Sequence, residues 1–244
     1  MDCYKIITDE EALIKFIEWL PDLKDNETFY LSLFCRKKYA PEAGMVKSND
    51  KTQLKRFTAN KENMIDKIRQ LEIPLGYYKL KDVVAPQEAL VLYIMPNPRC
   101  MKKATELMGK KCWDLIRSEN YNLHQEAMSC IQQSKSYGFV VDFDIDTKDV
   151  DLTKLNDIFF PIASSQFKNK PFDIVETRGG YHVLIQPNYA TAYLKAINSF
   201  GGHQVDINWY KRITEICPVD QSSDQMLPVV GTFQGGFVPK FITI

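Results

Sequence analysis

The segment 139–146 reads Phe-Val-Val-Asp-Phe-Asp-Ile-Asp, with acidic and apolar residues in alternation. Successive side chains of a β-strand leave opposite faces of the sheet, so the acids share one face and the apolar residues the other. The acids are Asp142, Asp144 and Asp146. Carboxylates that lie close together oppose each other's ionisation unless a cation binds between them. Hard divalent cations prefer oxygen ligands such as these. The strand therefore predicts a cation site; the alternative is a solvated acidic edge, although exposed faces usually mix charges of both signs.

The second half of the chain predicts the β-α-β-β-α-β order of a ferredoxin-like unit. The expected strands are 138–145, 172–176, 181–186 and 203–207, and the expected helices are 152–164 and 190–200. This order places the first strand between the fourth and the third, so side chains from distant segments can share one face. A hairpin of 226–230 and 237–242 is expected to close the chain.

The first half predicts a separate lobe over 1–135, with the ferredoxin-like lobe over 136–244; the fold class is α+β. Helices are expected at 8–20, 60–71, 101–118 and 123–134, strands at 28–35 and 89–95, and a long loop at 37–58. Basic residues predominate from Arg36 to Lys67 and in a cluster that begins with Arg99, Lys102 and Lys103. These positions favour a nucleic-acid-binding surface, although solvated helix faces would give the same counts.

Composition excludes several classes of protein. The 31 basic and 31 acidic residues cancel, so any attraction to nucleic acid must be local. No apolar run has the roughly 20 residues of a membrane span, and the start lacks a signal-peptide pattern, so a cytoplasmic protein without membrane partners is expected. The six cysteines form no Cys-x-x-Cys pair, which argues against a zinc knuckle or a disulfide framework.

A second candidate segment follows the acidic strand. Arg178-Gly179-Gly180 forms an expected tight turn, and His182 comes near the start of the next apolar strand. Glycines let a phosphate approach the backbone, Arg178 can bind it in a bidentate manner, and His182 can donate to it. The structural alternative is a plain hairpin turn followed by a buried histidine.

Two other metal motifs resemble the acidic strand. An EF-hand loop counted from Asp142 needs Gly at its sixth and Glu at its twelfth position, where this chain has Thr147 and Thr153. That motif is excluded. A sugar-nucleotide transferase, which uses Asp-x-Asp to hold a metal on a diphosphate, stays open.

These motifs together resemble the archaeo-eukaryotic primase superfamily, over about residue 138 to the C-terminus. Its first motif matches Asp142-Phe143-Asp144, and its second, a small residue, any residue and then His, matches Gly180-Tyr181-His182. Its third, an apolar residue followed by Asp, is best matched by Val205-Asp206, with Asp220 and Asp224 as rivals.

The resemblance implies a template-dependent nucleotidyltransferase, a DNA primase or primase-polymerase, with two Mg²⁺ or Mn²⁺ ions. Asp142, Asp144 and Asp206 would be the catalytic metal ligands. The implied nucleotide-binding residues are Arg178, Gly180, His182, Lys211, Arg212 and Thr232.

The implied partners are single-stranded DNA and nucleoside triphosphates. The compact chain favours a virus, plasmid or defence-system origin, or helicase and other replication proteins supplied in trans. A catalytically silent RRM-like nucleic-acid binder, in which Tyr181 and Phe143 stack on bases, is the alternative from another functional class.

Overall fold

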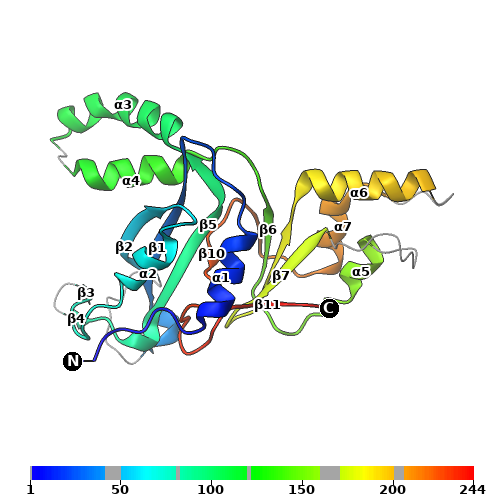
Figure 1. Cartoon of the computed structure of the whole chain (residues 1–244), viewed down its shortest axis with the longest axis horizontal. Coiled ribbons are helices and arrows are strands. Elements are labelled where there is room, and N and C mark those ends of the chain that lie inside the picture. The colour runs from blue at the N-terminus through cyan, green and yellow to red at the C-terminus, as the bar shows by residue number, and fades with distance from the viewer. Residues whose placement is uncertain (1, 42–50, 81–82, 120–121, 160–170, 201–205) are drawn as a thin grey trace. The chain divides into compact units, whose positions relative to one another are not determined.

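The computed structural model describes residues 2–41, 51–80, 83–119, 122–159, 171–200 and 206–244 (Figure 1). The chain forms two compact units, Met1–Tyr137 with Met226–Pro239 and Gly138–Gln225 with Lys240–Ile244. Each unit contains helices and an antiparallel sheet, which confirms the α+β class. The segment 226–239 belongs with the first unit, whereas the sequence placed it in the second lobe, because its strand pairs with a strand of the first unit.

The first unit is built on a sheet with the strand order β10-β5-β1-β2. Its strands are β1 (Glu27–Arg36), β2 (Lys51–Ala59), β5 (Leu90–Cys100) and β10 (Leu227–Pro228). Its helices are α1 (Glu10–Trp19), α2 (Met64–Arg69), α3 (Met101–Arg117) and α4 (Leu123–Gln133). A small ribbon of β3 (Lys79–Leu80) and β4 (Val83–Val84) and the 3₁₀ turns η1 (Lys37–Tyr39) and η3 (Gln87–Ala89) complete the described elements.

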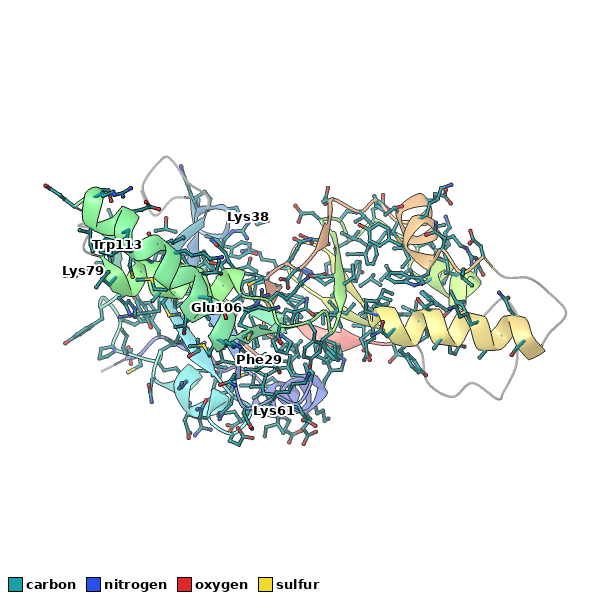
Figure 2. All side chains as sticks on the ribbon, turned by 90° about the horizontal axis from the view of Figure 1, so that it is seen from above. Phe29, Lys38, Lys61, Lys79, Glu106 and Trp113 are labelled. Carbon is teal, nitrogen blue, oxygen red and sulfur yellow. The ribbon has the colours of Figure 1, made fainter. Side chains whose placement is uncertain are left out.

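The first unit confirms the helices expected at 8–20, 101–118 and 123–134. The Asp9 side chain accepts a hydrogen bond from the Ala12 backbone N–H and caps α1, whose apolar face is buried. The helices α3 and α4 pack side by side as an antiparallel pair (Figure 1). Trp113 on α3 is nevertheless 70% exposed (Figure 2).

Strand β2 corrects the expectation of a loop over 37–58. It pairs with β1 from Phe29↔Ala59 to Arg36↔Lys51, with a register shift between Leu33 and Phe34. The strand is polar because it lies at the edge of its sheet, where charged side chains discourage pairing with other chains. Residues 42–50 of the expected loop lie outside the described part of the chain.

The second unit contains a five-stranded sheet with the order β11-β7-β8-β6-β9. Its strands are β6 (Val141–Ile145), β7 (Phe172–Glu176), β8 (Tyr181–Ile185), β9 (Gln221–Ser223) and β11 (Lys240–Ile242). Strand β6 therefore lies between β8 and a later strand, as a ferredoxin-like order requires. That later strand is β9 rather than 203–207; Asp206 and Ile207 are not in a strand, and 203–205 lie outside the described residues.

Helices α5 (Lys154–Phe159), α6 (Pro187–Phe200) and α7 (Trp209–Ile216) pack on one face of this sheet. Phe143 and Ile145 of β6 point into the resulting core, with Leu155, Leu194 and Ile213 from the three helices. The apolar half of the alternation is thus buried beneath helices, which leaves the acids on the other face of the sheet.

The expected closing hairpin does not form, because its two arms join different sheets. Strand β10 pairs with β5 and β11 pairs with β7. Between them, Gln234 and Phe237 exchange backbone hydrogen bonds of 2.7 and 3.0 Å. Gly235 and Gly236 have φ angles of 56° and 86°, a region that favours glycine, so the tight turn lies where the sequence placed it.

No helix within the described residues combines the length and the apolar character that a membrane span requires.

Candidate active site

The acidic strand brings its aspartates beside a histidine from a neighbouring strand. In the antiparallel register of β6 and β8, Asp144 lies directly opposite His182. Residues opposite each other share a face of the sheet, so His182 lies on the face that carries Asp142 and Asp144. Strand β9 flanks the other side of β6, with Gln221 opposite Asp144.

His182 is buried between the two carboxylates. Its Nδ1 atom lies 2.9 Å from both Oδ1 and Oδ2 of Asp142, and its Nε2 atom lies 3.6 Å from Oδ1 of Asp144. Asp142 is 1% exposed and His182 is 6% exposed. A carboxylate only accepts hydrogen bonds, so Nδ1 carries a proton and donates it to Asp142.

The charges around this pair shift two pKa values upward. Burial opposes a charge on His182, but the Asp142 carboxylate outweighs it, with help from Asp144, and the pKa of the imidazole rises above 6.5. Burial is also the main reason why the pKa of Asp144 is raised above 3.8. His182 opposes that rise, whereas Asp142, Asp146 and Asp220 add to it through like-charge repulsion.

Asp220 is the third carboxylate that the fold brings to the pair. Its backbone N–H donates to the Asp144 carbonyl oxygen at 2.9 Å, and its Oδ2 atom accepts from the Asp146 N–H at 2.9 Å. Asp206 is placed differently: it is exposed and its Oδ1 atom accepts from the Asn208 N–H at 2.8 Å, before α7. It is absent from the carboxylates that act on Asp144. The acid that follows α7, rather than the one that precedes it, lies beside Asp144.

The Gly-Gly turn is fixed by close packing. A Cβ atom on Gly180 would lie 1.8 Å from the Ile145 carbonyl oxygen and 2.7 Å from the Thr147 nitrogen. The turn is closed by the Thr177 N–H, which donates to the Gly180 carbonyl at 2.9 Å. Gly180 is therefore required so that the turn can contact the end of the acidic strand, and the Thr-x-Gly-Gly pattern is the sequence signal for it.

Arg178 and Lys211, both expected to bind phosphate, are exposed. Arg178 lies in the turn next to β8, whereas Lys211 lies on α7, 3.5 Å from Glu215. Arg212, also on α7, donates to the carbonyl oxygens of Ile158 at 3.3 Å and Asp157 at 3.1 Å. Helix α7 covers the core face of the sheet, so Lys211 and Arg212 are not brought to the aspartates.

The other predicted residues belong to the first unit. Thr232 is buried and its hydroxyl donates to the Val229 carbonyl at 2.7 Å. Arg99 is 1% exposed and donates to the Gln132 carbonyl at 3.0 Å, so it stabilises the contact with α4 rather than forming an open surface. Lys102 is exposed, and Lys103 is exposed but reaches the Lys135 carbonyl at 3.0 Å.

Comparison with known proteins adds no identification. No family model, curated protein or solved structure matches this chain.

The acidic cluster has the donor chemistry of a divalent-cation site. Asp142, Asp144 and Asp146 act electrostatically on the His182 imidazole, and Asp220 acts on Asp144, so these carboxylates outnumber the one positive charge that His182 can supply. In the described part of the chain, no three His, Cys, Asp or Glu side chains converge closely enough to form a complete metal site. The single Nδ1–H donor leaves lone pairs on Asp142 for a cation. The donors thus fit a hard cation, whose binding would require the carboxylates to draw together.

Proposed function

We propose that this chain is a metal-dependent nucleotidyltransferase, with a primase-polymerase core, that joins nucleoside triphosphates on a single-stranded DNA template. The observation that carries the proposal is the arrangement of Asp142, His182 and Asp144 on one face of two neighbouring strands. The strand order β9-β6-β8-β7 supports it, because that order gathers three distant segments of the chain around β6.

Asp142, Asp144 and Asp220 would hold the cations. Two Mg²⁺ or Mn²⁺ ions, when bound, would activate the 3′-hydroxyl and would neutralise negative charge on the triphosphate. The new bond joins the 3′-oxygen to the α-phosphorus, the α–β phosphoanhydride bond breaks, and pyrophosphate leaves. Asp220 replaces Asp206 in this assignment because it is the acid beside Asp144.

His182 acts as a positioning residue in this proposal. Both of its ring nitrogens face carboxylates, so it orients Asp142 and limits the repulsion between Asp142 and Asp144. Arg178, which is exposed in the adjacent turn, is the residue assigned to the departing pyrophosphate.

The silent RRM-like binder loses support from the described side chains. Phe143 is fully buried among the helices of the second unit and cannot stack on a base. The ring of Tyr181 is half-buried, with the Lys148 ammonium 4.8 Å from its centre. The two aromatic residues named for base stacking are thus buried or half-buried, which favours the metal-dependent proposal.

Calorimetry tests the proposal against its alternatives. Wild-type protein should bind a nucleoside triphosphate more tightly with Mn²⁺ than without it, and Asp144→Asn should remove that difference. Equal affinity with and without Mn²⁺ would favour a silent binder. Hydrolysis of a nucleotide-sugar without incorporation of a deoxynucleotide would favour the sugar-nucleotide transferase.

A further inference from the structure

A groove of about 520 Å³ lies at the edge strand β2 of the first unit. Its walls come from β2, from α2 and the chain that follows it, and from α4. Its basic and aromatic lining residues are Lys55, Arg56, Phe57, Lys67, Tyr78 and His124. The volume lies within the range of about 300–1,000 Å³ that small-molecule sites usually have.

The lining is basic. Lys55, Arg56, Lys67 and His124 contribute to the groove, and no Asp or Glu is among the described residues that line it. In a protein with no net charge, this local excess marks a surface that attracts anions.

Two of the basic side chains are held in place by the protein. Arg56 donates to the Ser129 hydroxyl at 3.1 Å, and Lys67 donates to the Thr58 carbonyl at 2.6 Å. A guanidinium has five N–H donors and an ammonium has three, so both groups keep donors for a ligand. Lys55 and His124, which also line the groove, are exposed.

The remaining surface is apolar and aromatic. Leu71, Tyr78 and Met128 are buried side chains that contribute to the groove, and Phe57, which also lines it, is half-buried. A flat apolar group can pack on such side chains, whereas a simple inorganic anion would leave them unused.

We propose that this groove binds a phosphorylated nucleoside, with the phosphate at the basic side chains and the base against the aromatic ones. The shared chemistry can come from a free nucleotide or from one nucleotide of a single strand. A peptide that adds to the edge of β2 is disfavoured, because Lys67 already occupies the Thr58 carbonyl. All lining residues belong to the first unit, so the proposal does not rest on the function assigned to the second.

The test measures binding to the full chain without metal, using dTMP, thymidine and a labelled short oligothymidylate. Lys55→Glu should weaken binding of the preferred phosphorylated probe at least about tenfold, a loss of about 1.4 kcal/mol. His124→Ala should weaken it less. Lys15→Glu, an equal charge change at an exposed position of α1 outside the groove, is the matched control and should leave the affinity within about twofold.

The probes also distinguish the two sources of the ligand. Binding of dTMP at least as tight as that of the oligonucleotide indicates a free nucleotide, and tighter binding of the oligonucleotide indicates a strand. Thymidine that binds as tightly as dTMP, the absence of binding by both phosphorylated probes, or equal losses in Lys55→Glu and Lys15→Glu would overturn the proposal. Capture of an uncharged extended peptide by the groove in place of these probes would also overturn it.

Discussion

The Nδ1 atom of His182 lies 2.9 Å from both carboxylate oxygens of Asp142, and both side chains are buried. This pair joins β8 to β6 on the face opposite the apolar core. The imidazole lies between the Asp142 and Asp144 carboxylates, so one contact contributes both to the stability of the sheet and to the arrangement of the site.

Removal of the histidine should destabilise the protein. His182→Leu leaves Asp142 buried without its partner, and we expect the free energy of unfolding to fall by about 3–5 kcal/mol. The double variant with Asp142→Leu should recover much of that loss, because both polar groups are then removed. Urea denaturation of the two single variants and the double variant measures the coupling. Additive effects of the two single changes would show that the pair does not interact.

The stabilisation by His182 should depend on pH. Its folded pKa is raised above the ordinary 6.5, so folding favours the protonated imidazole. The advantage of wild type over His182→Gln is then largest below pH 6.5 and declines as the pH rises through the folded pKa. NMR titration of the ring protons, with unfolding measured across the same range, checks both the pKa and the sign. An imidazole that titrates below 6.5 would contradict this prediction.

Asp144 should contribute to activity at the expense of stability. Its pKa is raised by burial and by neighbouring carboxylates, so its charge is unfavourable in the metal-free fold. We expect Asp144→Asn to leave the free energy of unfolding unchanged or to raise it by about 1 kcal/mol. The same change should reduce nucleotide incorporation by at least about 10²-fold. An Asp144→Asn variant that is less stable than wild type and fully active would contradict both expectations.

Two isosteric changes separate the candidates for the third carboxylate. Asp220→Asn should reduce incorporation by about 10²-fold, because Asp220 acts on Asp144 and bonds to the Asp146 N–H. Asp206→Asn is the matched control and should retain activity, since its carboxylate bonds to the Asn208 N–H. Activity assays on both variants decide which aspartate is the third metal ligand. Loss of activity in Asp206→Asn alone would assign that role to Asp206 instead of Asp220.

Gly180 should not tolerate a side chain. The Cβ of Gly180→Ala would lie 1.8 Å from a backbone oxygen, so the turn must shift, and we expect a loss of about 2–3 kcal/mol. Gly138→Ala is the matched control in the same unit, because a Cβ there meets no atom within 4 Å. Thermal or urea denaturation compares the two. Equal stability of both variants would show that the close approach is absent.

The sequence predicts the site best where the pattern is strongest. The alternation around Asp142 and Asp144 is sufficient to assign each side chain to a face, because strand geometry permits little else. The ferredoxin-like strand order predicts that β8 lies beside β6, and the pairing of Asp144 with His182 confirms it. The strand order does not predict the hydrogen bond from His182 to Asp142, since that bond depends on side-chain rotamers.

The missed elements have weak or conflicting local signals. Strand β9, Gln221–Ser223, is short and polar, so no apolar periodicity marks it. Helix α7 carries Trp209 and Ile213 one turn apart, a helical signal too short to stand out directly after an expected strand. The edge strand β2 resembles a loop in sequence because several of its side chains are charged.

Template-directed incorporation tests the central claim most directly. The protein is incubated with a single-stranded DNA template, labelled nucleotides and Mn²⁺, with and without a primer, beside the Asp142→Asn and Asp144→Asn variants. The account predicts labelled products that depend on the template and on Mn²⁺ and that both variants lose. Wild-type protein that binds nucleotide yet forms no product, or variants that still extend primers, would contradict it.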